Sequence, residues 1–457
     1  MISLAIAQPD ILPYLARPSV WTAVAIAIYM LGAALLTVAA TRPVVRALEQ
    51  NQTPSAKMLR RHGLLDAAYR CWLIAGQGAV MTLGYAHWIE TSLGEYRIPL
   101  LAKAAILVPF LVTVILCWFL DYRFHQAVRD TLGDQQGSAR AYWSRGRHVA
   151  YNIRHMLLFT IVPISIIMLV TDVLEMHLLA LAPRDLQGPI YLAASLGTVV
   201  TVFLLAPVIL TRIWRTRTLE PGPLRSDLED LCGRLKFKYR DILVWESDGV
   251  ISNAAVMGLL APVRYILVSD GIIDRMDRQY IRAVFAHEGG HVTSHHLGYL
   301  MVLAVSVMTL CQTAAAFAAE FGDLPDPLAI ALMLAGVMGF GWLLFGLVSR
   351  QFERQSDVIG AWASAPDPEN SPRITHEGAA LFAGALQQIA QQNGINQNAR
   401  NWRHGSIAKR VQYILMLGST GGRRTTIDRT VKRIKIAILL GAVAAGAAMI
   451  TQIQMGL

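Results

Sequence analysis

The chain has 457 residues, of which 54% are hydrophobic and 16% are charged, and its formal net charge is +10. Soluble domains carry roughly 25% charged residues, so this composition argues against an ordinary soluble protein and indicates a membrane protein. The positive charge alone could indicate a nucleic-acid partner. Its distribution along the chain assigns it to membrane topology instead, and we expect no nucleic-acid ligand.

Eight stretches without Asp, Glu, Lys or Arg are long enough, or nearly so, to cross a bilayer, which takes about 20 apolar residues. They cover residues 18–41, 71–89, 104–120, 156–171, 186–211, 297–319, 327–349 and 436–457. The fourth is short and the second follows polar residues (Asp66, Arg70), so these two could be tilted or partial helices. Residues 1–7 lack a basic segment and a full apolar core, so they do not predict a signal peptide.

The charges beside these stretches follow a pattern. Basic residues follow the first, third and fifth stretches and precede the eighth, whereas the other connections are neutral or acidic. Cytoplasmic loops of membrane proteins are enriched in Lys and Arg. The pattern therefore predicts an integral membrane protein with both termini outside and its large loops in the cytoplasm, where anionic lipid of the bilayer adds a further contact.

Two long polar segments separate the predicted spans. In the first, residues 241–246, 252–257 and 264–269 are predicted strands, and residues 274–300 are predicted to form one long helix. In the second, a helix is predicted around residues 376–393. The predicted organisation is an N-terminal bundle of about five spans (1–214), an α+β segment (215–296), a two-span hairpin (297–349), a helical segment (350–435) and a C-terminal span (436–457).

The most informative residues are His287, Glu288 and His291, in the run Ala-Val-Phe-Ala-His-Glu-Gly-Gly-His. On a helix, two histidines four positions apart lie on one face and can hold one Zn²⁺ at about 2.0–2.1 Å. A carboxylate beside them can accept a proton from the attacking water. The motif therefore predicts the centre of a zinc hydrolase, most often a peptidase, with one zinc ion per chain.

A catalytic zinc site needs a third protein ligand. His295 shares the helical face but lies two turns from His287, about 12 Å along the axis. His295 and His296 are therefore expected to lie where the helix enters the bilayer. Glu353 follows two further spans, and an even number of crossings returns it to the same membrane face. Asp357, four residues later, could accept the free ring N–H of a ligating histidine. A solvated, charged helix end is the alternative for both carboxylates.

Four motifs in this order resemble the membrane zinc proteases that include the CAAX prenyl endopeptidases and the HtpX-like quality-control proteases. They are the two-strand region from Ser252 to Gly271, the His-Glu-x-x-His run, Arg-x-x-Glu-x-x-x-Asp from Arg350, and the run from His404 to Val411. The resemblance covers roughly residues 225–415. Five spans before the catalytic segment are similar to the CAAX protease layout, whereas the eighth span departs from both groups.

The resemblance implies a mainly α membrane protein, a multi-span helical bundle with a small α+β zinc-metalloprotease domain at the cytoplasmic face. Gly289 replaces a bulky apolar residue and Gly405 a proline, so we expect a looser helix and a looser loop. The implied roles are zinc ligands for His287, His291 and Glu353, general base for Glu288, orientation of a ligand for Asp357, oxyanion stabilisation and substrate binding for His404 and Arg410, and edge-strand pairing with substrate for Asn253, Ala254, Ala255 and Val256.

These residues favour an integral-membrane zinc endopeptidase that cuts a peptide or membrane-protein substrate at the cytoplasmic face. One alternative is a signalling protease whose spans sense a ligand, although the predicted external loops are short for a sensor. Another is a catalytically silent zinc-binding scaffold, which loss of Glu288 or of a ligand would indicate; the sequence retains all of them. The substrate, its prenylation and the oligomeric state stay open.

Overall fold

The fold is that of a computed structural model, which describes residues 17–93, 100–136, 143–174, 177, 183–322, 324–365, 373–399, 401–422 and 425–455. The prediction for residues 1–7 lies outside this range. The chain forms two compact units, Met1–Trp214 and Arg215–Leu457, and each is described by itself.

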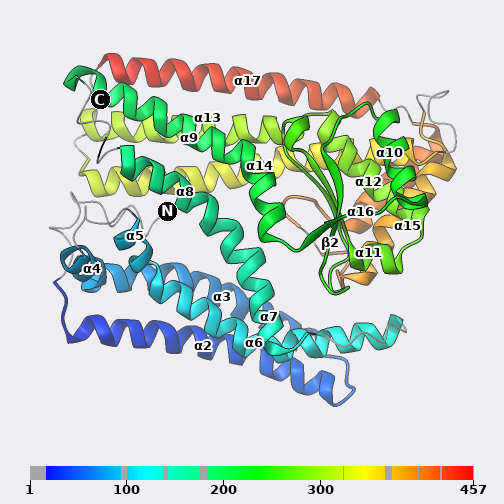
Figure 1. Ribbon diagram of the computed structural model, residues 1–457, viewed down its shortest axis with the longest axis horizontal. Coiled ribbons are helices and arrows are strands. Elements are labelled where there is room, and N and C mark those ends of the chain that lie inside the picture. Colours follow the sequence, from blue (N-terminus) through cyan, green and yellow to red (C-terminus); the bar gives the residue numbers. More distant parts are fainter. Residues whose placement is uncertain are drawn as a thin grey trace. The chain divides into compact units, whose positions relative to one another are not determined.

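The described part of the first unit consists of helices, apart from their connections (Figure 1). Tyr29 and Trp72 show how polar groups are satisfied inside it: Trp72 Nε1 donates to the Tyr29 carbonyl over 2.9 Å, and the Tyr29 hydroxyl donates to Leu73 O over 3.2 Å. The elements are α2 (Val20–Glu49), α3 (Ala56–Val80), a π-helical segment (Met81–Tyr85), α4 (Ala86–Leu93), α5 (Leu101–Ile106), α6 (Val108–Gln136), α7 (Arg145–Asn152), a second π-helical segment (Ile153–Leu158), α8 (Phe159–Val173) and α9 (Arg184–Ile213).

Seven helices among the described residues are long and apolar enough to cross a membrane. They correspond to seven of the eight predicted stretches, and the prediction of a multi-span helical membrane protein is confirmed. The second stretch, 71–89, is interrupted: Leu83 (φ −81°, ψ 23°) and Gly84 (φ 105°) leave the helical conformation between α3 and α4. An ideal Cβ on Gly84 would lie 2.8 Å from the Arg17 carbonyl oxygen, so the close approach of this backbone requires glycine.

The second unit contains a four-stranded sheet in the order β1-β2-β4-β3. The strands are β1 (Thr216–Thr218), β2 (Asp241–Trp245), β3 (Ala254–Met257) and β4 (Tyr265–Ser269). β2 and β4 are parallel, whereas β1 and β3 run antiparallel to their neighbours. The three predicted strands are confirmed to within two residues. β1 was not predicted, because three residues are too few to show an alternating pattern.

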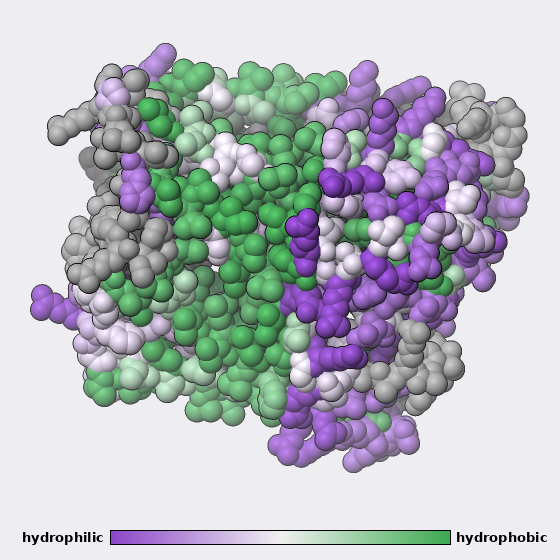
Figure 2. Space-filling view, viewed as in Figure 1, coloured by the Kyte–Doolittle hydropathy of each residue, from purple (hydrophilic) through white to green (hydrophobic). Residues whose placement is uncertain are grey.

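Eight helices of the described residues complete this unit: α10 (Pro223–Arg234), α11 (Asp270–Arg275), α12 (Arg278–Thr293), α13 (His296–Phe321), α14 (Asp326–Ala363), α15 (His376–Gln392), α16 (Ile407–Thr420) and α17 (Thr425–Gln454). Away from the sheet, α13, α14 and α17 contain three of the candidate spans, whereas the end with the sheet is mostly hydrophilic in Figure 2. The unit therefore joins an apolar helical part to a polar α+β part, as the sequence predicted.

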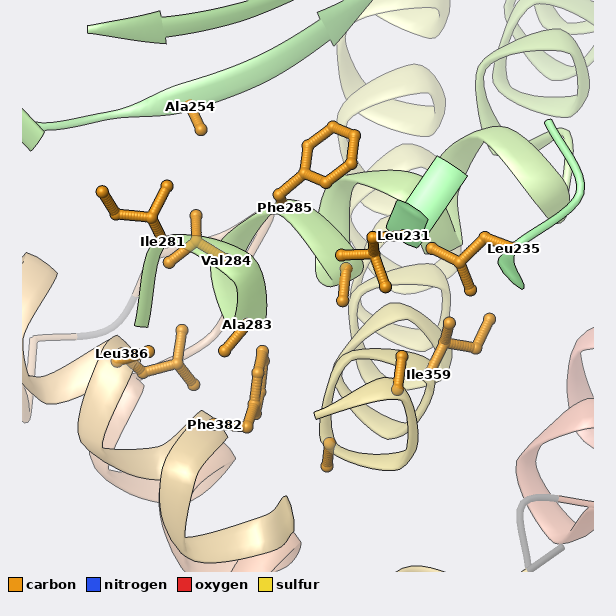
Figure 3. Close-up of a cluster of buried hydrophobic side chains, with 14 of the residues drawn as sticks. Leu231, Leu235, Ala254, Ile281, Ala283, Val284, Phe285, Ile359, Phe382 and Leu386 are labelled. Atoms are coloured by element: carbon orange, nitrogen blue, oxygen red, sulfur yellow. The ribbon is translucent and has the colours of Figure 1, made fainter. Parts of the chain in front are cut away.

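Helix α12 lies at the centre of the core of the polar part. Its Ile281, Val284 and Phe285 are buried together with Leu231 of α10 and Phe382 of α15 (Figure 3). This packing fixes the helix on which the His-Glu-x-x-His motif lies. The prediction of one helix over residues 274–300 is wrong, because His295 adopts a left-handed conformation (φ 56°) and separates α12 from α13.

Candidate active site

Two glycines allow the motif helix to pack closely against its neighbours. An ideal Cβ on Gly290 would lie 3.1 Å from Ser356 Cα, which shows how near the backbones of α12 and α14 approach. An ideal Cβ on Gly289 would lie 2.6 Å from Leu235 Cδ1 and 3.1 Å from Phe237 Cε1. These two side chains therefore occupy the space that a larger residue at position 289 would fill, and the looser helix stays a prediction.

Three potential metal ligands lie on α12 and α14, and the ends of their side chains lie close together. His287 Nε2 and His291 Nε2 are 3.3 Å apart, and each lies 3.5 Å from an oxygen of Glu353. Ligand atoms held tetrahedrally at about 2.0–2.1 Å from zinc are about 3.3–3.4 Å from each other. The buried Glu353 Oε2 makes no hydrogen bond with the described residues, so a cation there would satisfy it. The two histidines and the carboxylate thus fit one zinc ion.

Asp357 orients the first of these histidines. Its Oδ1 lies 3.0 Å from His287 Nδ1, on the opposite side of the ring from the ligand atom Nε2. Arg410 in turn donates two hydrogen bonds to Asp357, from Nε (2.9 Å) and from Nη2 (2.6 Å). Burial alone would lower the pKa of His287, but its contacts with Asp357 and Glu353 raise this pKa to about 10. The carboxylates of Asp357 and Glu353 thus stabilise positive charge at the His287 ring.

His296 orients the second histidine, and the sequence did not reveal it. The residue begins the candidate span of α13, where it was expected, and its side chain is buried. Its Nδ1 lies 3.0 Å from His291 Nδ1, and its Nε2 lies 2.8 Å from Gln355 Oε1. Gln355 Nε2 donates to Asp428 Oδ1 on α17 over 2.5 Å. On an unbroken helix, residues five apart point in different directions, and only the left-handed His295 brings His296 back to His291.

Burial and the neighbouring His287 lower the pKa of His291 to about 3. Its ring is therefore neutral at ordinary pH, which is the form that ligates a metal. If Nε2 holds the metal, Nδ1 carries the proton and donates it to His296 Nδ1. His296 then donates from Nε2 to Gln355. All the hydrogen bonds from His291 to Asp428 can therefore point in one direction.

The predicted residue His404 reaches the same place from the loop before α16. Its Nδ1 lies 2.7 Å from Glu353 Oε1, and its side chain is 41% exposed. Asn401 and Gly405 form the base of this loop through two backbone hydrogen bonds, of 2.8 and 3.3 Å. Gly405 has φ +74°, whereas proline is confined to about −65°. Glycine here builds a turn that proline could not adopt, and the looser loop stays a prediction.

Glu288 lies beside the three potential ligands and remains partly exposed. Its surroundings are largely desolvated, which raises the pKa of its carboxyl group. A pocket of about 130 Å³ adjoins the site between α14 and α16, lined by Glu353, His404 and Arg410 together with the basic residues Arg350, Arg354 and Lys409. The site therefore combines a candidate proton acceptor with a small cationic pocket.

The segment predicted to bind substrate, Asn253 to Val256, contains the first three residues of β3, at one edge of the described sheet. The Asn253 backbone N–H donates to Ser269 Oγ over 2.9 Å. Asn393, which follows α15, donates from Nδ2 to the Ser252 carbonyl over 2.7 Å. Asn393 was not singled out from the sequence, because the two segments are far apart along the chain. Pairing of this edge with substrate stays a prediction.

Fold and site together define a helical membrane protein with a candidate metal site on a His-Glu-x-x-His helix. Residues 219–373 match the family described as peptidase family M48. This segment is similar to the CAAX protease and HtpX-like proteins of that family.

Individual relatives agree with this assignment. A protease HtpX homologue of Aeropyrum pernix is 29% identical over 118 residues, and a CAAX prenyl protease 1 homologue of Arabidopsis thaliana is 29% identical over 172 residues. These matches cover 25% and 34% of this chain and only 36% and 40% of the relatives. The crystal structure of S. mikatae Ste24p has a similar fold, with a TM-score of 0.52 and 15% identity, and the match covers 87% of this chain and 100% of Ste24p.

Proposed function

We propose that this chain is an integral-membrane zinc-dependent endopeptidase whose active site faces the cytoplasm. The observation that carries the proposal is the convergence of His287, His291 and Glu353 at spacings that suit one zinc ion. Glu288 lies next to His287 in the motif. The basic loops described above support the cytoplasmic orientation.

When bound, zinc supplies Lewis-acid chemistry: it polarises a carbonyl and lowers the pKa of water. Glu288 accepts the proton of the attacking water and then passes it to the leaving amine. Its raised pKa suits this double task, because burial makes the carboxylate a better proton acceptor than an exposed one. His404, half-exposed beside Glu353, donates a hydrogen bond to the carbonyl oxygen as negative charge develops there.

Arg410 has a further task in this scheme. Two of its donors hold Asp357, and Asp357 holds the ring of His287. The arginine thereby positions a ligand as well as adding positive charge near Glu353, whose Oε2 lies 3.4 Å from Nη2. Its predicted direct contact with substrate remains part of the proposal.

The substrate is a peptide segment of a membrane or membrane-associated protein. An extended segment would pair with the free edge of β3 and so present its backbone in a fixed register. The tie between Asn393 and Ser252 supports this assignment, because it holds the residue that leads into the strand.

The test compares zinc content and casein cleavage for the wild type, Glu288→Gln and the control Glu377→Gln, an exposed acid at the start of α15. We expect zinc to be retained in all three proteins and cleavage to be lost only in Glu288→Gln. Loss of zinc from the wild type would refute the metal site. Zinc with no cleavage of casein or of a panel of transmembrane substrates would favour the silent scaffold, and cleavage of a single regulator would favour the signalling protease.

A further inference from the structure

Three further metal-binding side chains converge in the first unit, at the adjoining ends of two candidate spans. Asp121 and His125 lie four residues apart on α6, and His148 lies on α7. Each offers a ligand atom, and these atoms all lie within 4.8 Å of one another. None of the three belongs to the segment that matches family M48.

Their geometry resembles that of the candidate zinc site. Asp121 Oδ1 lies 3.1 Å from His148 Nε2, and Asp121 Oδ2 lies 3.6 Å from His125 Nε2. These separations are close to the 3.3–3.5 Å between the potential ligand atoms of His287, His291 and Glu353, called the M48 site below. The two histidine rings are 5.0 Å apart between centroids, which is also the separation of the His287 and His291 rings.

The surroundings give the cluster one fixed side and one open side. The side chain of His148 is 3% exposed and that of Asp121 is 19% exposed, whereas that of His125 is 47% exposed. Tyr122 packs edge-on against the His148 ring, with centroids 5.8 Å apart. The neighbouring cation of Arg145 lies over the rings of Phe119 and Tyr122, so two aromatic faces already stabilise its charge. An ion could therefore enter from the His125 side.

We propose that Asp121, His125 and His148 bind a divalent transition metal of the zinc type. Imidazole and carboxylate are suitable ligands for zinc, and three of them leave a fourth position for water. The ion would join α6 to α7, and hence the candidate span Val108–Thr131 to the candidate span Arg145–Val173. Because metal binding is coupled to folding, it would stabilise this pair of helices.

The experiment counts zinc per chain in the purified full-length protein, without a polyhistidine tag, at a controlled free zinc concentration. The variants are His125→Ala, His291→Ala and their combination. We expect two zinc ions in the wild type, one in each single variant and none in the double variant. His125 is the appropriate ligand to replace, because its half-exposed side chain contributes little to the core.

The control is His62→Ala, which removes another histidine of the same unit that stacks on Phe124. This variant should keep both ions. Asp121→Asn should weaken the binding of the second zinc at least tenfold, because a neutral amide replaces a charged ligand. Two ions in His125→Ala, a single wild-type ion that His125→Ala retains, or an equal loss in His62→Ala would each overturn the proposal. Failure of the M48 site alone would instead leave a single wild-type ion that His291→Ala retains and His125→Ala removes.

Discussion

Zinc binding at the M48 site should depend on Gln355, although two hydrogen bonds separate it from the proposed ligand His291. Gln355 accepts from His296 and donates to Asp428, and His296 accepts from His291. Replacement by leucine keeps the approximate size of the side chain and removes both polar groups. His296 then loses the partner that fixes its tautomer, and His291 loses its oriented acceptor.

The expected loss of zinc affinity follows from the position of Gln355 in this series of hydrogen bonds. Removal of a group that orients a metal ligand typically weakens metal binding 10- to 100-fold, which corresponds to about 1.4–2.8 kcal/mol. The effect of Gln355→Leu should lie in this range, because His296 is buried and has no route to solvent for its ring N–H. Asp428→Asn should weaken zinc binding less, since an amide oxygen can still accept from Gln355.

The assay is a competition between the purified protein and a zinc chelator of known affinity, with folding checked by thermal denaturation. The matched control is Gln392→Leu, which removes another buried glutamine whose Nε2 donates to the Arg275 carbonyl over 3.0 Å. That variant should lose stability but keep its zinc affinity when folded. A zinc affinity of folded Gln355→Leu within threefold of the wild type would refute the chain of hydrogen bonds as the means by which His291 is held.

Three further changes test other parts of the site. Asp357→Asn should weaken zinc binding about 10- to 100-fold in the same competition assay, because the group that orients His287 becomes neutral; unchanged binding would contradict that role. Gly290→Ala should lower the free energy of unfolding by about 1–3 kcal/mol in chemical denaturation, because its Cβ would press on Ser356, and a neutral effect would show that α12 and α14 can separate freely. Gly405→Pro should reduce the cleavage rate with zinc retained, because proline cannot adopt φ +74°; wild-type cleavage would show that this turn does not position the active loop.

Local sequence patterns were sufficient for much of the architecture. The apolar stretches predicted all seven candidate spans among the described residues, because the length needed to cross a bilayer is a property of the segment alone. The strands β2, β3 and β4 were predicted by their composition and by the turns between them. His287 and His291 were predicted to lie on one face because their spacing and the helical period decide this directly.

The remaining parts depended on contacts between distant segments. Resemblance to known proteases, rather than local patterning, pointed to Glu353, Asp357, His404 and Arg410, and the tertiary structure brings them to the motif helix. No glycine or proline at residue 295 indicated the left-handed turn there. Only the tertiary structure shows that this turn returns His296 to His291.

The sequence by itself determined that this is a membrane protein with a His-Glu-x-x-His helix, because hydropathy and helical spacing are local properties. Tertiary structure alone decided that Leu235 and Phe237 fill the space beside Gly289, and that α17 reaches the site through Asp428. It likewise brought His148 to Asp121 and His125. The physical reason is that packing and metal-ligand geometry depend on which surfaces meet, and no single segment contains that information.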